Sequence, residues 1–158
     1  MRLLLLLLVA LAGCAGPNLD VDPFLILGTG ETEFVPLTGA VDDLPIAFGI
    51  QGGEHVWGAV RATGMDWTNL TIIWELLDAD DDPVTGTTTI RQSLSHCTRS
   101  DGGCEGGMGE IVAVTVILDD ANAVRGDELT MVVTASDEDG REATASSQIR
   151  PVLEIDTN

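Results

Sequence analysis

Residues 129–141 read Leu129-Thr130-Met131-Val132-Val133-Thr134-Ala135-Ser136-Asp137-Glu138-Asp139-Gly140-Arg141, and this stretch decides the fold class of the chain. Its first half alternates apolar and polar side chains with a period of two, the pattern of a strand that buries one face. Its second half is an acidic turn that contains glycine. A further alternating run of small residues follows at 143–149, so the stretch predicts an antiparallel hairpin. We expect the core to receive Leu129, Met131, Val133 and Ala135.

The same alternation recurs along the chain between clusters of glycine, aspartate and proline, and no stretch shows a sustained helical period. In residues 70–77 one face is predicted to carry Leu70, Ile72, Trp74 and Leu76. In residues 111–118 one face is predicted to carry Val112, Val114, Val116 and Leu118. Residues 87–94 are mostly polar, which favours an edge strand. About seven strands are expected, at 24–27, 44–49 continued by 56–62 with a bend at Gln51-Gly52-Gly53, 70–77, 87–94, 111–118, 129–135 and 143–149.

The last of these strands resemble a known family. Arg125-Gly126-Asp127-Glu128 before Leu129, the acidic turn and the final small-residue strand are similar to the last hairpin of immunoglobulin-like domains of bacterial surface proteins. Trp74 stands where such domains have the core tryptophan of their third strand. The resemblance implies an all-β, immunoglobulin-like antiparallel sandwich of two sheets over residues 23–152, with a tail at 153–158. The chain departs from the family because it has no cysteines for the inter-sheet disulfide and no tyrosine for a tyrosine corner.

Residues 1–13 have the parts of an export signal: Arg2, an apolar core at 3–11 and small residues before the cut. The apolar core is shorter than the roughly 18 residues that cross a bilayer. Leu11-Ala12-Gly13-Cys14 is similar to the lipobox of bacterial lipoproteins, in which the cysteine receives a diacylglyceryl group and becomes the new N-terminus. This implies a cleaved signal peptide at 1–13, a lipid anchor on Cys14 and a tether at 14–22. The alternative is an ordinary signal peptide that carries a cysteine.

The position after the lipidated cysteine bears on the destination of the protein. In the best-known sorting rule for such lipoproteins, an aspartate at this position retains the protein at the inner membrane. The residue here is Ala15, which favours the cell envelope's outer membrane. The sequence leaves open whether the domain faces the periplasm or the cell surface.

The chain is strongly acidic. It has 7 basic and 26 acidic residues and a formal charge of −19. Removing residues 1–13 takes away one arginine and no acid, so the charge of the remainder is −20. Nucleic acid is therefore excluded as a partner, because binding it requires basic residues that neutralise phosphates. The charge serves solubility or favours cationic partners.

Three cysteines are present, Cys14, Cys97 and Cys104. If Cys14 carries lipid, the other two remain as a pair in an oxidising compartment, which predicts a disulfide between Cys97 and Cys104. Closing so small a loop would contribute roughly 2.5 kcal/mol in the chain-entropy model. The alternative is a metal site that uses His96 with both thiols. Titration of the delipidated protein distinguishes them, since a disulfide leaves no reactive thiol.

Gln51-Gly52-Gly53-Glu54-His55-Val56-Trp57 is the least ordinary segment. It resembles a segment of uncharacterised lipoproteins of similar size, which implies no known activity. Alternation places His55, Trp57 and Arg61 on one face, and if the valines face the core, these side chains and Gln51 form an exposed binding patch. The alternative is that Gly52-Gly53 forms a bulge, which His55 and Trp57 brace.

Clusters of aspartate in the turns are the other candidate site. Calcium takes six to eight oxygen ligands, and carboxylates for it are available at Asp78, Asp80, Asp82, Asp137 and Asp139. None of these clusters has the spacing of a twelve-residue calcium loop, and acidic residues are common in hairpin turns. We expect no cofactor, with calcium as the alternative.

Catalytic motifs are absent from the sequence: there is no Gly-x-Ser-x-Gly elbow, no His-Glu-x-x-His helix and no phosphate-binding glycine loop. We therefore expect a membrane-anchored binding or structural module that is not an enzyme, with an envelope or extracellular protein or a glycan as partner. The alternatives are a calcium-stabilised adhesive or assembly domain and a small cell-envelope enzyme. A deep polar pocket that holds His55 or His96 near carboxylates would favour the enzyme.

Overall fold

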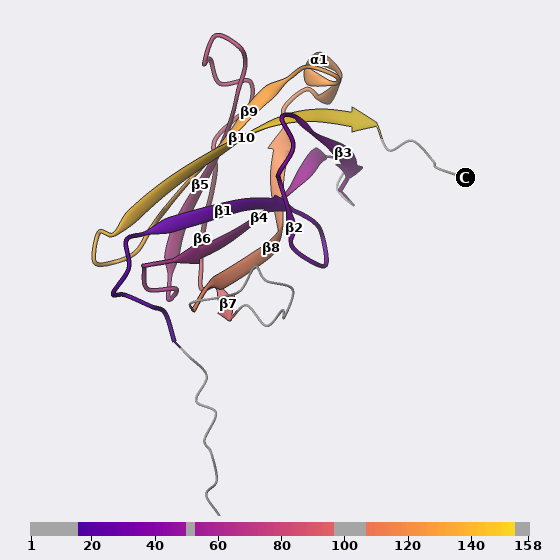
Figure 1. Cartoon of the computed structure of the whole chain (residues 1–158). Coiled ribbons are helices and arrows are strands. Elements are labelled where there is room, and N and C mark those ends of the chain that lie inside the picture. The colour runs from indigo at the N-terminus through magenta and orange to yellow at the C-terminus, as the bar shows by residue number, and fades with distance from the viewer. Residues whose placement is uncertain (1–15, 50–52, 97–106, 154–158) are drawn as a thin grey trace, which may run out of the picture.

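The computed structural model describes residues 16–49, 53–96 and 107–153 and is all-β apart from one short helix (Figure 1). The all-β prediction is confirmed. Ten strands within these ranges belong to a single sheet. They are β1 (Phe24–Thr29), β2 (Val35–Pro36), β3 (Asp42–Phe48), β4 (Glu54–Thr63), β5 (Leu70–Leu77), β6 (Thr88–Gln92), β7 (Ser95–His96), β8 (Gly109–Leu118), β9 (Leu129–Ser136) and β10 (Glu142–Leu153). Of the predicted site residues, Cys14, Gln51, Cys97 and Cys104 lie outside the described ranges.

The sheet has two halves that share strand β3. Its order is β2-β1-β4-β3-β10-β9-β5-β6, and β8 pairs with β4, with the short β7 beside the start of β8. β3 is antiparallel to β4 but parallel to β10, with Ile149 beside Asp42 and Leu153 beside Ile46. The sheet is therefore mixed, and Figure 1 shows how it curls, with β10 crossing above the layer that contains β1 and β4.

The region from β3 to β4 differs from the prediction of one bent strand. The two segments are separate strands that pair antiparallel, with Ala47 opposite His55 and Phe48 opposite Glu54. The backbone N–H of Gly49 donates to the carbonyl of Gly53 over 2.7 Å, which closes the hairpin.

The core confirms the predicted faces of β5 and β9. Every second residue of each strand is buried, and the set comprises Leu70, Ile72, Trp74, Leu76, Leu129, Met131, Val133 and Ala135. Trp74 packs against β4 at Gly58, where an added Cβ would lie 2.7 Å from the indole ring. The polar strand β6 ends the strand order, so the predicted edge strand is also confirmed.

Strand β8 follows the prediction only beyond a bulge. Val114, Val116 and Leu118 are buried as expected, but Ile111 is buried in place of Val112. The register with β4 shifts at this point, and Ala113 has a positive φ of 58°. An extra residue in one strand exchanges its inward and outward faces, which explains why the predicted burial of Val112 is wrong.

A short helix, α1 (Ala121–Val124), connects β8 to β9. Asp120 caps it, since its side chain accepts hydrogen bonds from the backbone N–H groups of Asn122 and Ala123. One turn is too short to give a helical period, so the sequence pattern does not reveal it. In the described part of the chain, no helix has the length and hydropathy needed to span a membrane.

Candidate functional site

The outer face of β4 carries the predicted patch residues, but they are not all exposed. His55, Trp57 and Arg61 lie on one face, as alternation predicts, while Val56 and Val60 belong to the core on the other. His55 and Arg61 retain only 5% and 4% of their accessible surface. The expectation of one exposed patch is therefore wrong for these two residues.

Arg61 is buried because the connection between β1 and β2 covers it. Phe34 in that connection places its ring 4.2 Å from the guanidinium carbon, and Arg61 Nε donates to Glu110 Oε2 over 2.7 Å. The connection is fixed across β4 by two hydrogen bonds, from Thr29 Oγ1 to the Trp57 carbonyl and from the Ala113 N–H to the Gly30 carbonyl. Arg61 thus stabilises the fold and is not available to a ligand.

His55 and Trp57 form a pair at the other end of β4. Their ring centroids lie 4.4 Å apart with an interplanar angle of 79°, an edge-to-face contact. Nε2 of His55 is buried and has no hydrogen-bond partner among the described residues. A buried polar atom without a partner costs free energy, so the described residues leave the hydrogen-bonding capacity of this nitrogen unused.

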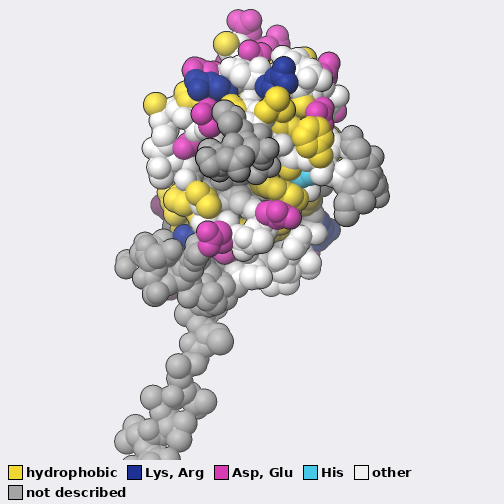
Figure 2. All heavy atoms as spheres, turned by 90° about the vertical axis from the view of Figure 1, so that its right-hand side faces the viewer, with side chains coloured by type: hydrophobic (Ala, Val, Ile, Leu, Met, Phe, Trp, Pro, Cys, Tyr) yellow, Lys and Arg dark blue, Asp and Glu magenta, His cyan; other side chains and the backbone are white. Residues whose placement is uncertain are grey.

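Beside this pair the surface has a hollow of about 500 Å³. It is lined by Glu31, Phe48, Gly49, Gly53, Glu54, His55, Trp57, Thr115 and Ile117. Phe48 and Ile117 are 68% and 53% exposed, although side chains of this kind are usually buried. Figure 2 shows hydrophobic side chains gathered near a histidine on the face that carries the end of β3. We call this set of nine residues the His55 hollow.

The register of the sheet explains how the hollow is assembled. In the β4–β8 pair, Ile117 lies opposite His55 and Thr115 lies opposite Trp57, so these four side chains share the outer face. The β3–β4 hairpin adds Phe48, which lies opposite Glu54. The hollow is open and mainly apolar, with Glu31 and Glu54 as its charged residues.

Sequence reasoning identifies His55 and Trp57 but misses Phe48, Thr115, Ile117 and Glu31. The sequence pattern places Phe48 within one continuous strand. In the run that contains Ile117, alternation predicts which residues face the core but not which residues of other strands lie beside the outward-facing ones. Cross-strand partners follow from register, which a single sequence does not display. The exposed phenylalanine at the end of an apolar run is the one signal that was available.

The acidic turns use their carboxylates within the fold. Asp78 Oδ1 accepts hydrogen bonds from the backbone N–H groups of Asp80 and Asp82 at 2.9 and 3.0 Å. These contacts are those of an aspartate turn. Within the residues that the structure describes, no group of three or more His, Cys, Asp or Glu side chains is placed to hold a metal ion.

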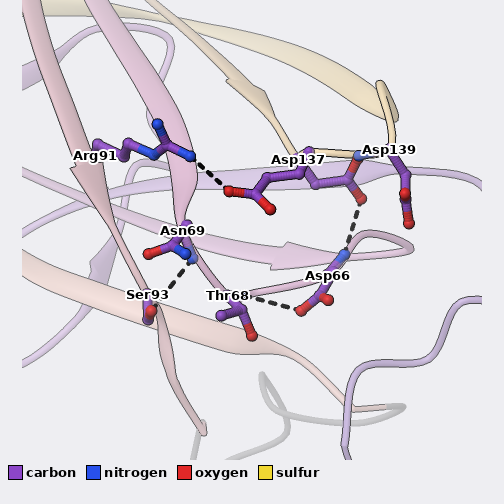
Figure 3. Close-up of polar contacts among 8 residues, drawn as sticks. Asp66, Thr68, Asn69, Arg91, Ser93, Asp137 and Asp139 are labelled. Atoms are coloured by element: carbon purple, nitrogen blue, oxygen red, sulfur yellow. Dashed lines mark hydrogen bonds and ion pairs between the residues drawn. The ribbon is translucent and has the colours of Figure 1, made fainter.

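Asp137 is the most engaged of these carboxylates (Figure 3). Its Oδ2 accepts from the N–H of Asp66 at 3.0 Å, and its Oδ1 accepts from the N–H groups of Asp139 and Arg141 at 3.1 and 2.9 Å. Burial raises the pKa of Asp137, but these hydrogen bonds and the charge of Arg141 outweigh it, so the pKa lies below its ordinary value. Asp137 therefore ties the β9–β10 turn to the segment before β5.

A larger hollow of about 640 Å³ lies beside α1. It is lined by Asp78, Ala79, Val84, Ala123, Val124, Asp127, Glu128 and Leu129. No aromatic side chain lines it, and no buried polar atom without a partner points to a ligand there. The His55 hollow has both features, so it is the better candidate site.

Comparison of the chain with protein-family models, with curated proteins and with solved structures finds no match.

Proposed function

We propose that this chain is a lipid-anchored domain of the bacterial cell envelope that binds a segment of a partner protein in the His55 hollow. The segment inserts an apolar or aromatic side chain next to a basic residue. The observation that carries the proposal is the coincidence of exposed Phe48 and Ile117 with the buried, unpartnered Nε2 of His55.

Apolar burial would supply the main part of the affinity. Phe48 and Ile117 expose most of their side chains, and Trp57, which is half-buried, lines the hollow with them. Each square ångström of apolar surface removed from water contributes about 25 cal/mol, and aromatic side chains in such hollows are common centres of binding energy. A protein side chain of matching shape fits this surface better than a polar glycan does.

Charge favours a basic residue beside the inserted side chain. Glu31 and Glu54 line the hollow, and no arginine does. The chain as a whole carries a formal charge of −19, which attracts cationic segments and repels anionic ones. Because Glu31 is exposed and Glu54 is only partly buried, we expect these carboxylates to affect specificity and association rate.

The strand directions support an arrangement in which the site points away from the membrane. Gly16 lies against Gly107, where its carbonyl oxygen is 3.0 Å from the position of an added Cβ, and Cys14 is two residues earlier. From this end β8 runs ten residues to Leu118, opposite Glu54, a distance of about 30 Å. A lipid on Cys14 would therefore leave the hollow accessible to a partner.

The immunoglobulin-like arrangement is part of this proposal. It is supported by the complete burial of Trp74 in β5 and by the long antiparallel β9–β10 hairpin, in which Leu129 pairs with Ile149. In this arrangement, binding through the ends of strands and their hairpins leaves the core unchanged.

The test uses two indole compounds of opposite charge and one uncharged sugar. Tryptamine carries the indole and a positive charge, indole-3-acetate carries the indole and a negative charge, and chitotriose represents an uncharged glycan. Each is titrated into the isotopically labelled soluble domain while the imidazole signals of His55 and the indole signal of Trp57 are followed by NMR. We expect saturable shifts with tryptamine and weaker binding of indole-3-acetate.

Two phenylalanines give matched variants. Phe48→Ser removes the exposed wall of the hollow, whereas Phe24→Ser changes a residue of β1 that is 56% exposed and does not line it. Tryptamine affinity should fall in the first variant and stay unchanged in the second. Equal binding of both indoles, or equal loss in both variants, would contradict the proposal, and selective binding of chitotriose would identify a glycan site instead.

A further inference from the structure

Among the residues that the structure describes, strand β8 has a free edge along most of its length. On the side away from β4, β7 pairs only with Gly109 and Glu110. In the described ranges, no strand pairs with residues 111–118 on that side. The backbone N–H and C=O groups along such an edge are available to another strand.

The side chains along this edge do not protect it. Residues 111–118 read Ile-Val-Ala-Val-Thr-Val-Ile-Leu and include no charge, proline or glycine. Natural edge strands are commonly blocked by charged residues or proline. The bulge at Ala113 interrupts the edge near one end, which leaves Val114 to Leu118 as a regular segment.

The inner side of the edge opens into a groove. A cavity of about 350 Å³ is lined by Ile90 and Gln92 of β6 and by residues 111–115 of β8. A second cavity of about 290 Å³ continues it toward β7 and shares Gln92, Ile111 and Val112. The groove is bordered by core residues, since Ile111 and Val114 are buried and Ile90 packs against the core.

The outer side of the same edge adjoins the His55 hollow. Thr115 lines both the hollow and the groove. Ile117 and Thr115 lie between the free edge and their partners His55 and Trp57. Because side chains of a strand alternate between its two faces, one strand added to β8 would reach the groove with one set of side chains and the hollow with the other.

We infer that the partner segment of the proposed function binds as an added β-strand along β8, with alternating apolar side chains and basic residues. This inference rests on that function. A second copy of this chain fits less well, because antiparallel pairing of two β8 strands places the Gly16 ends, and with them the proposed anchors, at opposite ends of the dimer.

The test uses the backbone of a probe peptide. The parent probe is the peptide RVTWTVR, acetylated at its N-terminus and amidated at its C-terminus. Two N-methylated isomers accompany it: both are methylated at every second backbone nitrogen, and the methylated positions of one isomer are the unmethylated positions of the other. Each N-methylated isomer loses the N–H groups of one edge and keeps those of the other. We expect one isomer to bind at least about tenfold more weakly than the other, because only one edge faces β8.

Hydrogen exchange of the protein gives the second readout. The parent peptide should slow exchange of amides within residues 111–118, and tryptamine should not. Equal binding of both isomers, unprotected β8 amides, or no binding of the parent peptide at about 1 mM would overturn the inference.

The two proposals can fail separately. A tryptamine response at His55 with equal binding of both isomers overturns strand addition alone. A difference between the isomers with no response at His55 or Trp57, and no effect of Phe48→Ser, overturns the hollow alone. The protein without peptide can also be examined for a dimer that forms as the salt concentration is raised and dissociates when the peptide binds. Such a dimer would identify a second copy of the chain as the occupant of the β8 edge and would overturn the inference.

Discussion

Asp137 is the residue whose ionisation the fold uses most directly. Its carboxylate accepts three backbone hydrogen bonds, from Asp66, Asp139 and Arg141. Asp137→Asn replaces an acceptor oxygen by an NH₂ group and removes the charge. We expect a loss of about 2 kcal/mol in the free energy of unfolding near neutral pH, measured by denaturant titration.

The pH dependence follows from the direction of the pKa shift. The pKa of Asp137 is lower in the folded protein than in the unfolded chain, so its contribution is complete above the unfolded value of about 3.9. It is lost as the pH falls through the lower, folded pKa. The difference in the free energy of unfolding between the wild type and Asp137→Asn should therefore narrow in this acidic range. A difference that stays constant down to about pH 2 would contradict the lowered pKa of Asp137.

Gly58 gives a second prediction at the scale of one residue. A Cβ at this position would lie 2.7 Å from Trp74 and 3.1 Å from Val116, both of which are fully or nearly fully buried. Gly58→Ala should cost about 2 kcal/mol through overpacking. Gly53→Ala is the matched control, since nothing lies within 4 Å of its added Cβ, and similar losses in both variants would show that the indole does not restrict this site.

The alternation of apolar and polar residues correctly predicts which side chains are buried where one face of a strand packs against the core. Trp74 and Met131 are buried as the pattern predicts. It fails for Arg61, because Phe34, which is distant in sequence, covers this side chain on the opposite face. It also fails for His55, whose ring is buried and packs against Trp57. A period of two separates the faces of a strand but does not say whether both are covered.

At the scale of elements, the β1–β2 connection decides the burial of Arg61. Phe34 is 4% exposed and packs against Arg61 and Gly28. Phe34→Ala should cost about 3–5 kcal/mol and should raise the solvent exposure of Trp57 by loosening the hydrogen bond from Thr29.

Phe24→Ala is the control for this connection, because Phe24 is 56% exposed in the strand that precedes it. Its effect on the free energy of unfolding should stay within about 0.5 kcal/mol. Denaturant titration and tryptophan fluorescence measure both quantities. A small loss for Phe34→Ala would show that the connection does not hold the face of β4.

The positions of the strands could be predicted from the sequence better than the pairing between strands could. β5, β8 and β9 lie near their expected ranges, because each has a clear alternation. The β3–β4 hairpin and the parallel pairing of β3 with β10 were not predicted. Long-range pairing depends on which edges meet when the chain collapses, and the pattern within one strand does not contain this information.

At the scale of the whole molecule, the proposal places a lipid anchor at one end and a binding site at the other. If Cys14 is lipidated, cells that express the chain should incorporate labelled palmitate into it, and Cys14→Ala should abolish the label and release the protein into the soluble fraction. Ala15→Ser is the control, since it leaves the cysteine in place. Persistence of the label in Cys14→Ala would contradict the anchor, while leaving the His55 hollow as proposed.

In the proposed binding mode, a ligand inserts an apolar ring into the His55 hollow. The most direct test of this binding mode is the measurement of intermolecular nuclear Overhauser effects between tryptamine and the wild-type domain. We expect cross-peaks from the indole of tryptamine to the rings of His55, Trp57 and Phe48 and to the methyl groups of Ile117. Cross-peaks confined to other surfaces, such as the hollow beside α1, or no cross-peaks at saturating tryptamine, would contradict it.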